Sequence, residues 1–267
     1  MIIGKMEMQA CLSGKTGNPH GFLGLHSLGS GKGMVARCLD PGADSVSLLD
    51  LRSQTEHSME RLDPSGFFEL SLPSDHERFA YLLVSRRGEV SCKWEDPYRF
   101  LPVIGNEELR GFNEGWDRRP FEKLGSVPRK VDGVDGVSFV VWAPSAQSVH
   151  LTGDFNGWST ISLPMRALGS SGCRELFVPQ AKIGQKYKYR VLGLDGTLRE
   201  KADPFAFRCE SPPGNASIIH ARNESGPGSG SLSPIHPLNP REEPLSIYEM
   251  HLGSLPSITR NTSSNFI

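Results

Sequence analysis

The stretch Val149–Trp158, with the sequence VHLTGDFNGW, decides the fold, because an alternating strand runs directly into a tight turn. Apolar Val149 and Leu151 alternate with polar residues, which is the period-two pattern of a half-buried strand. The glycines and the asparagine that follow supply the positive φ angles and the local hydrogen bonds of a tight turn. The pattern therefore predicts a strand that ends in a loop carrying Trp158.

Two interpretations of Trp158 are open on this turn alone. An indole ring is flat and apolar, so an exposed Trp158 matches the CH-rich face of a sugar ring while its N–H stays hydrated. Alternatively, the ring caps the hydrophobic core of its own domain. The turn by itself does not separate a stacking platform from a core residue.

An internal repeat organises most of the chain. Residues 33–48 match residues 136–151 at an offset of 136 − 33 = 103, and both copies contain a strand, a Pro-centred turn and a second strand. The match closes where Asp96-Pro97-Tyr98 corresponds to Asp203-Pro204-Phe205. A repeat of about 100 residues exceeds the period of solenoids and predicts two domains of one fold. The identical pairs include Gly33/Gly136, Pro41/Pro144, Ala43/Ala146, Ser45/Ser148, Val46/Val149 and Leu48/Leu151.

Short alternating segments separated by turn signals predict an all-β fold of two tandem immunoglobulin-like β-sandwiches. Asp195-Gly196 and Arg87-Gly88 each lie between two such segments and predict hairpins. The expected strands of the second copy are residues 137–142, 148–152, 174–179, 186–192 and 197–201, and those of the first copy include residues 67–72, 80–85 and 89–94.

The pattern also predicts a division of the chain. We expect an N-terminal sandwich at residues 17–105, a connecting segment at 106–130 and a second sandwich at 131–222. A Gly-, Ser- and Pro-rich linker follows at 223–244. Residues 245–267 then begin with one short buried strand, which is orphaned because nothing after it has a matching pattern.

The balance of charges excludes several functional classes. The chain of 267 residues has 29 basic and 30 acidic side chains, so it lacks the electrostatic footprint of a protein that binds nucleic acid or an anionic membrane. A neutral partner such as a polysaccharide is compatible with this balance.

The five cysteines are widely spaced and include no close pair of the metal-ligand or redox type. No apolar run approaches the roughly 18 residues of a membrane helix, and residues 1–14 lack the apolar core of a secretory signal. We therefore expect a cytoplasmic protein with reduced thiols, with no metal and no cofactor.

Several motifs occur in the order that is typical of a known family. They are Val141-Trp142-Ala143-Pro144, Gly153–Trp158, Tyr187-Lys188-Tyr189 and Lys201-Ala202-Asp203-Pro204-Phe205. Together they resemble carbohydrate-binding module family 48, and Ile247–Ser254 resembles the first strand of the α-amylase-type (β/α)8 barrel of glycoside hydrolase family 13. With the duplicate module in front, Asn18–Ser254 resembles the N-terminal region of glycogen branching enzyme (1,4-α-glucan branching enzyme), a transferase of glycogen biosynthesis.

The resemblance implies a carbohydrate-binding site in the second sandwich. Trp158 matches the sugar-stacking tryptophan of this module type, and Lys188 matches a lysine that donates to glucan hydroxyls in relatives that bind glycogen. Asn156 completes the expected site, although it and Asp154 are turn formers first. On spacing alone, a solvated strand residue is the favoured alternative for Lys188. A second stacking tryptophan of some relatives falls near Leu198 here, a departure that we expect to lower the affinity.

The resemblance also implies a reaction, in which an α-1,4-glucan chain is transferred to a 6-hydroxyl by a retaining carboxylate pair. In the family these carboxylates lie in barrel segments that would follow this chain, so we expect no catalytic residue here and no branching by the chain alone. Asp96 and Asp203 occupy Asp-Pro corners, where we expect a turn or cap role. The expected partners are an α-glucan (glycogen or amylose) and the missing catalytic domain.

Two alternatives are compatible with the same residues. In one, both sandwiches only pack against a barrel and bind no glucan. In the other, the chain is a truncated, non-functional gene product, which the polar and aperiodic residues 256–267 favour. The first copy has no Asn-Gly-Trp element after Leu48, so we expect it to serve packing, although Trp94 offers an unrelated surface.

Overall fold

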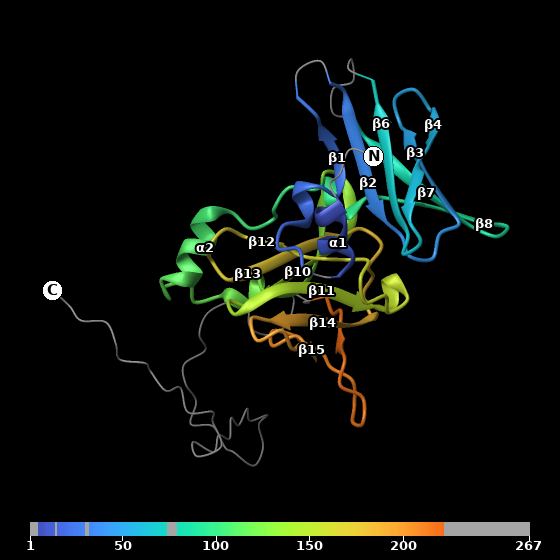
Figure 1. Ribbon diagram of the computed structural model, residues 1–267. Coiled ribbons are helices and arrows are strands. Elements are labelled where there is room, and N and C mark those ends of the chain that lie inside the picture. Colours follow the sequence, from blue (N-terminus) through green and yellow to red (C-terminus); the bar gives the residue numbers. More distant parts are fainter. Residues whose placement is uncertain (1–4, 14, 30–31, 74–78, 222–267) are drawn as a thin grey trace, which may run out of the picture. The chain divides into compact units, whose positions relative to one another are not determined.

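The computed structural model describes residues 5–13, 15–29, 32–73 and 79–221 (Figure 1). In these residues the expected all-β class is confirmed, because the strands pair antiparallel in four sheets, two for each copy of the repeat. The expected linker at residues 223–244 and the orphan strand after it lie outside the described residues. None of the described helices is long and apolar enough to span a membrane.

The first sandwich packs two four-stranded sheets around a core of its own. Buried Leu48 and Leu83 lie opposite each other in register and point into this core. One sheet has the order β1 (Gly24–Ser27), β2 (Met34–Leu39), β6 (Phe67–Leu72) and β5 (Glu60–Asp63). The other has the order β4 (Glu56–Ser58), β3 (Ser45–Asp50), β7 (Tyr81–Arg87) and β8 (Val90–Trp94).

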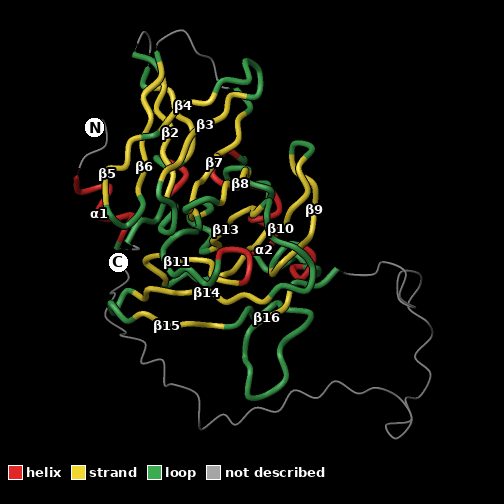
Figure 2. The backbone as a smooth tube through the Cα atoms, turned by 90° about the vertical axis from the view of Figure 1, so that its right-hand side faces the viewer, coloured by secondary structure: helices red, strands yellow, loops and turns green. Residues whose placement is uncertain are grey.

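The second sandwich repeats this plan, and Figure 2 shows its two layers, with β11, β14 and β15 below β13, β10 and β9. The upper sheet has the order β12 (Arg166–Ala167), β13 (Cys173–Val178), β10 (Val134–Trp142) and β9 (Gly125–Val131). The lower sheet contains β11 (Ala146–Gly153), β14 (Lys186–Gly193) and β15 (Leu198–Lys201), with β16 (Ser217–Ile218) paired to β14. Val149 and Leu151 point into the core, as their alternation predicts.

Helices are few, and the region expected to connect the sandwiches contains one of them. α2 (Asn106–Asn113) begins where the Glu108 carboxylate accepts the Gly105 N–H at 2.9 Å. The same region ends in β9, which is the edge strand of the second sandwich. α1 (Lys5–Leu12) precedes the first predicted boundary. The boundaries of the predicted domains stay predictions. Four single-turn 3-10 helices complete the described elements: η1 (Pro19–Gly21), η2 (Pro97–Arg99), η3 (Pro120–Glu122) and η4 (Asp154–Asn156).

The two Asp-Pro corners are equivalent hydrogen-bonded caps. Asp96 accepts the Tyr81 hydroxyl at 2.7 Å and the Tyr98 backbone N–H at 2.9 Å. Asp203 likewise accepts the Tyr187 hydroxyl at 2.6 Å and the backbone N–H two residues further on at 2.8 Å. Burial raises the pKa of Asp96 to about 6 and also raises that of Asp203. Their cap contacts account for both carboxylates, as the sequence suggests.

Each sandwich also buries an ion pair whose glutamates occupy equivalent strands, β6 and β13, while the arginines come from different neighbouring strands, β2 and β12. The Arg37 Nε donates to Glu69 at 2.9 Å in the first sandwich, and the Arg166 Nε donates to Glu175 at 2.7 Å in the second. Glu175 is fully buried and also accepts the backbone N–H of Val103, from the segment that joins the sandwiches. The repeat therefore includes a matched buried glutamate in each sandwich, which is paired with an arginine from a different strand in each case.

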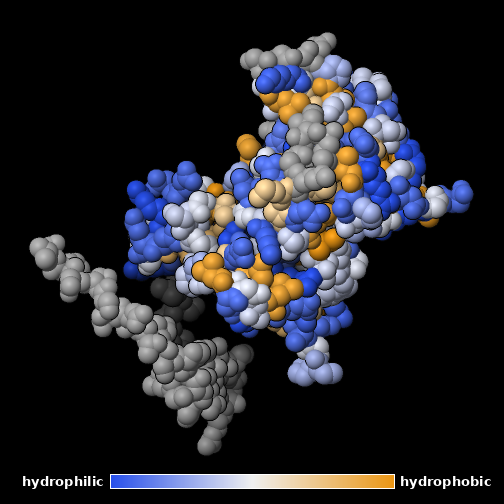
Figure 3. Space-filling view, in the orientation of Figure 1, coloured by the Kyte–Doolittle hydropathy of each residue, from blue (hydrophilic) through white to orange (hydrophobic). Residues whose placement is uncertain are grey.

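The second sandwich shares its core with parts of the first. Met8 and Cys11 of α1, together with Tyr98, lie in one buried cluster with the inward residues of β10, β11 and β14. The Tyr98 hydroxyl donates to the backbone carbonyl of Pro164 at 3.2 Å. On the face that Figure 3 shows, hydrophobic side chains of the described residues lie in small groups among hydrophilic ones.

Candidate functional site

The turn after β11 holds Trp158 in a conformation that bulky residues rarely adopt. We call residues 153–159 the indole turn. Gly157 and Trp158 both lie in the left-handed region, with φ of 60° and 59°, and the Trp158 N–H donates to the Gly153 carbonyl at 2.9 Å. A non-glycine residue in this region costs on the order of 1–3 kcal/mol, and such residues cluster at functional sites.

The indole of Trp158 is outside the core. Its side chain is 39% exposed, and it belongs to none of the buried clusters of the described residues. Of the two interpretations that the sequence left open, the exposed ring fits this position and the core cap does not.

Asp154 fixes the direction of the ring. One carboxylate oxygen of Asp154 accepts the Trp158 Nε1–H at 2.9 Å, and the other accepts the backbone N–H of Lys186 at 2.8 Å. The same side chain thus joins the indole turn to β14 and limits the rotation of the ring. The sequence identified Asp154 as a turn former, but its contact with a strand 32 residues away could not be predicted from the turn.

Asn156 uses its side chain inside the turn. Its Oδ1 accepts the Gly153 N–H at 2.9 Å, and its Nδ2 donates to the Leu151 carbonyl at 3.2 Å and to the Ser162 hydroxyl at 3.0 Å. These bonds make Asn156 the residue that shapes the turn. Its expected contact with carbohydrate stays a prediction.

Lys188 lies beside the indole turn. It pairs with Thr152 across β11 and β14, one position from the pair of Gly153 with Tyr187. Tyr187 and Tyr189 are buried in the core, so Lys188 points to the outer face of this sheet, where it is half-buried. The structure records no ion pair for its ammonium among the described residues, which leaves three N–H donors for other partners.

The same outer face contains three polar side chains whose importance the sequence did not show. His150 and Thr152 are 4% and 2% exposed, and Arg190 pairs with His150 across the strands. The Nε2 of His150, the Oγ1 of Thr152 and the Nε of Arg190 are buried without a hydrogen-bond partner in the described part of the chain. Unpaired buried polar atoms are costly, and these three atoms are covered by the protein itself.

The alternation of residues did predict that His150 and Thr152 face away from the core, but not that they are covered. The backbone after the indole turn approaches this face, where Arg190 donates to the Thr160 carbonyl at 3.4 Å. Burial, with a smaller contribution from Arg190, lowers the pKa of His150 from 6.5 to about 4. The imidazole is therefore neutral at pH 7.

Leu198 occupies the place where some relatives of this module type have a second stacking ring. It begins β15 directly after the Asp195-Gly196 hairpin, which forms as expected, and its side chain is 49% exposed. An aliphatic side chain has no flat face, so this position offers contact without stacking.

The site contains an indole with its Asp154 carboxylate partner, the Lys188 ammonium, the Arg190 guanidinium and neutral polar side chains, with no cluster suited to a metal among the described residues. No group of three or more His, Cys, Asp or Glu side chains within residues 5–13, 15–29, 32–73 and 79–221 is arranged to hold a metal ion. The arrangement can stack on an apolar ring face and donate hydrogen bonds to hydroxyl groups.

Two families match the chain, one for each sandwich. Residues 123–206 match "Carbohydrate-binding module 48 (Isoamylase N-terminal domain)", so the second sandwich belongs to a class of carbohydrate-binding modules. Residues 5–98 match "alpha-1,4-glucan branching enzyme GlgB, N-terminal domain". The chain as a whole corresponds to the N-terminal part of 1,4-alpha-glucan branching enzymes of the GlgB family.

Curated relatives agree with this assignment. The chain is 41% identical over 252 residues to the 1,4-alpha-glucan branching enzyme GlgB of Mycobacterium ulcerans. The aligned region covers 93% of this chain and 34% of that protein. It is 39% identical over 251 residues to the GlgB enzyme of Rhodospirillum rubrum, covering 92% of this chain and 34% of that protein. The chain thus spans about a third of the length of these relatives.

Solved structures of pullulanases align less well. The type I pullulanase of Bacillus subtilis, complexed with maltose, covers 79% of this chain and 27% of its own, with 16% identity and a TM-score of 0.32. The assignment of the chain rests on the family and sequence matches above.

Proposed function

We propose that the chain binds an α-glucan, such as glycogen or amylose, at the indole turn. Trp158 stacks on a glucose ring, and Lys188 donates hydrogen bonds to hydroxyl groups. Asn156 holds the turn in shape and lies near the bound sugar. The observation that carries the proposal is the exposed Trp158, which is kept in the left-handed region and oriented by Asp154.

The neighbouring sheet face supports the same proposal. Lys188 lies on this face without an ion pair among the described residues, so its ammonium can donate to hydroxyl groups of a ligand. A neutral ligand also agrees with the net charge of −1 of the whole chain.

The first sandwich, we propose, serves packing. At the same offset of 103, Thr55 stands where the second sandwich has Trp158 (158 − 55 = 103). Leu82 occupies the register position of Lys188, because Asp50 pairs with Tyr81 as Gly153 pairs with Tyr187. Without an indole or an ammonium group at these positions, the first sandwich lacks the counterpart of the site.

Affinity electrophoresis in native gels with and without glycogen tests the proposed site. We expect glycogen to retard the wild type, and Trp158→Ala to weaken the apparent affinity at least about tenfold, because removal of a central aromatic anchor costs about 2 kcal/mol or more. Trp116→Ala is the matched control, since Trp116 is 55% exposed after α2 and its retardation should not change. Equal retardation of the wild type and Trp158→Ala refutes the proposal.

A second variant separates binding from folding. Trp158→Gly removes the ring and also the strain of a side chain at positive φ, so it should fold at least as well as Trp158→Ala. Loss of retardation in both variants, with circular dichroism spectra like that of the wild type, assigns the loss to the indole.

We propose that, in the branching reaction, this protein chain holds the glucan while a catalytic domain transfers an α-1,4-glucan segment to a 6-hydroxyl. We propose that this catalytic domain is also its packing partner. We also propose a cytoplasmic setting, which the five free thiols support. The chain alone should leave the iodine absorbance of amylose unchanged, and a progressive loss of that absorbance contradicts a purely binding role.

A further inference from the structure

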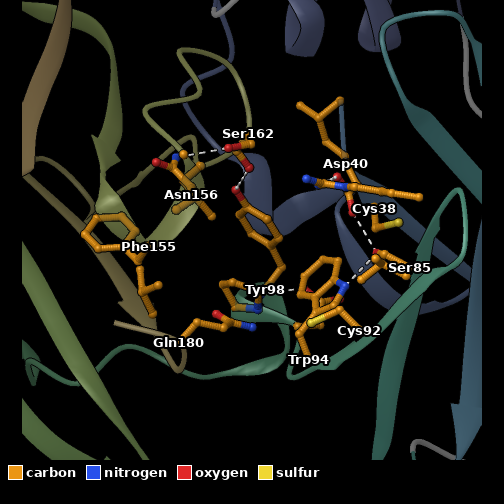
Figure 4. Close-up of a pocket in the computed structure, with 18 residues that line it drawn as sticks. Cys38, Asp40, Ser85, Cys92, Trp94, Tyr98, Phe155, Asn156, Ser162 and Gln180 are labelled. Atoms are coloured by element: carbon orange, nitrogen blue, oxygen red, sulfur yellow. Dashed lines mark hydrogen bonds and ion pairs between the residues drawn. The ribbon is translucent and has the colours of Figure 1, made fainter. Parts of the chain in front are cut away.

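A cleft of about 400 Å³ lies between the two sandwiches, next to the indole turn but apart from the Trp158 ring. Figure 4 shows its walls, with Ser85, Cys92 and Trp94 of the first sandwich facing Asn156, Ser162 and Gln180 of the second. The volume is within the range of pockets that bind small ligands. We propose that this cleft is a second subsite for the α-glucan, an inference that rests on the proposed glucan-binding function.

One wall of the cleft is an apolar strip on an edge strand. Val90, Cys92 and Trp94 alternate along β8, so their side chains share one face, and all three line the cleft. The Trp94 Nε1–H donates to the Ser85 hydroxyl at 2.8 Å. This bond holds the indole in place and satisfies its only polar group, so that the ring can offer a fixed apolar surface to a sugar.

The polar groups of the cleft carry little net charge. The Asp40 carboxylate accepts from Arg87 and from the Ser85 hydroxyl, both at 2.6 Å, so its charge is paired within the wall. Neutral amide and hydroxyl groups form the opposite side. Gln180 donates to the Glu95 carbonyl at 2.8 Å, and Ser162 accepts from Asn156 at 3.0 Å. The Gln180 carbonyl oxygen and the Ser162 hydroxyl hydrogen can therefore bond to a neutral, polyhydroxylated ligand.

The position of the cleft links it to the proposed glucan site. Asn156 and Gly157 of the indole turn line the cleft, and Trp158 follows Gly157 directly. Consecutive Cα atoms are about 3.8 Å apart, so the lining of the cleft reaches the backbone next to Trp158 without including its ring. A fixed aromatic ring, neutral polar groups and this continuity favour a further part of the same oligosaccharide over a charged or purely apolar ligand.

Cys92 provides a direct readout of occupancy. Cys92 and Cys209 are exposed, whereas Cys11, Cys38 and Cys173 are buried, so a thiol reagent should modify two sites. Cys92 lines the cleft and Cys209 does not, which makes Cys209 an internal control. The rates are measured with an aromatic disulfide reagent, with and without maltoheptaose, and are assigned with the Cys92→Ser and Cys209→Ser variants.

We expect maltoheptaose at about ten times its Kd to slow modification of Cys92 about tenfold and to leave Cys209 unchanged. Equal rates for Cys92 with and without the saccharide, at concentrations that saturate the wild type, overturn the inference. Equal slowing of both thiols also overturns it, because the effect is then not local.

The Trp158→Ala variant separates this inference from the proposed function. At concentrations raised to offset weaker binding, Cys92 should still be protected in Trp158→Ala if the cleft is a subsite. If maltoheptaose protects Cys92 in the wild type but not in Trp158→Ala, the proposal of a separate subsite is overturned. Glucan binding at the indole turn is not affected by that result. Protection in this variant, together with unchanged glycogen retardation, supports the cleft and refutes the indole turn.

Discussion

Turns follow equivalent strands of the two sandwiches, but they differ in backbone hydrogen bonding and in side chains. In the second sandwich the Trp158 N–H donates to the Gly153 carbonyl; at the equivalent turn of the first, the Asp50 N–H donates to the Thr55 carbonyl. Gln54 and Gly157 occupy equivalent positions and share the left-handed conformation, with φ of 58° and 60°. The comparison shows that the two turns share one left-handed position, whereas the left-handed Trp158 and its carboxylate partner Asp154 belong to the second copy alone.

The sheet faces beside the two turns differ in the same direction. Thr152 and Lys188 pair across the second sandwich where Leu49 and Leu82 pair across the first. His150 likewise stands at the position of Ser47 (150 − 47 = 103). The face beside the turn is therefore more polar in the second sandwich than in the first, which agrees with the proposed binding site in the second.

The largest expected effect concerns the scaffold that both sandwiches share. Glu175→Ala leaves the Arg166 guanidinium buried without its carboxylate and removes the acceptor of the Val103 N–H, so we expect a loss of about 3–5 kcal/mol in the free energy of unfolding. Glu69→Ala is the matched change in the first sandwich. Urea unfolding monitored by circular dichroism measures both variants.

We expect Glu175→Ala to be at least as destabilising as Glu69→Ala, because Glu175 also accepts the backbone N–H of Val103 in the segment between the sandwiches. A loss below about 1 kcal/mol for Glu175→Ala would mean that the buried pair is dispensable, and the matched contacts would then not be a shared requirement of the fold.

The second effect depends on pH and involves only the second sandwich. The pKa of His150 is about 4 in the folded chain and 6.5 in its ordinary state, so the unfolded chain takes up a proton first as the pH falls. This contribution to stability is complete above pH 6.5 and is lost as the pH falls toward 4. Between pH 7 and pH 5 the loss is about 2 kcal/mol for this one group.

Urea unfolding of the wild type and of His150→Gln at both pH values checks the sign and the size. The decrease in stability on going from pH 7 to pH 5 should be smaller in His150→Gln by about 2 kcal/mol. An identical decrease in the two proteins would show that His150 is protonated as readily in the folded chain as in the unfolded one.

The third effect concerns the ammonium group of the proposed site. Lys188→Met keeps the apolar stem and removes the donor, so we expect the affinity for maltoheptaose to fall about fivefold, equivalent to about 1 kcal/mol. Lys182→Met, at an exposed lysine before β14, is the control and should bind as the wild type does. Isothermal titration calorimetry of the three proteins measures the difference. Unchanged affinity in Lys188→Met favours the alternative of a solvated strand residue.

The strands were predictable where alternation and turn chemistry agreed. The alternation of Val149 and Leu151 correctly predicted which face of β11 points into the core. Asp195-Gly196 correctly predicted the hairpin between β14 and β15. The sequence pattern did not predict β9, because Pro128 and three charged or polar neighbours interrupt the alternation that is typical of a strand. An edge strand tolerates proline, since one side of it needs no ladder hydrogen bonds, and β9 pairs only with β10.

The candidate site was predictable only in part. The sequence placed Trp158 on a loop, and the ring is exposed there. It could not show that Asp154 reaches the backbone of Lys186, because that contact depends on how two distant strands align. Nor could it show that His150 and Thr152 are buried, since period-two alternation assigns a face without indicating what covers it.

The most direct test of the comparison is a titration of the isotopically labelled chain with maltoheptaose, followed by the indole and backbone N–H resonances. The Trp158 indole resonance, assigned by its absence in Trp158→Phe, and the backbone amides of residues 153–159 should shift, while those of residues 50–55 remain in place. Shifts at residues 50–55 with an unmoved Trp158 resonance would contradict the account and place glucan binding in the first sandwich.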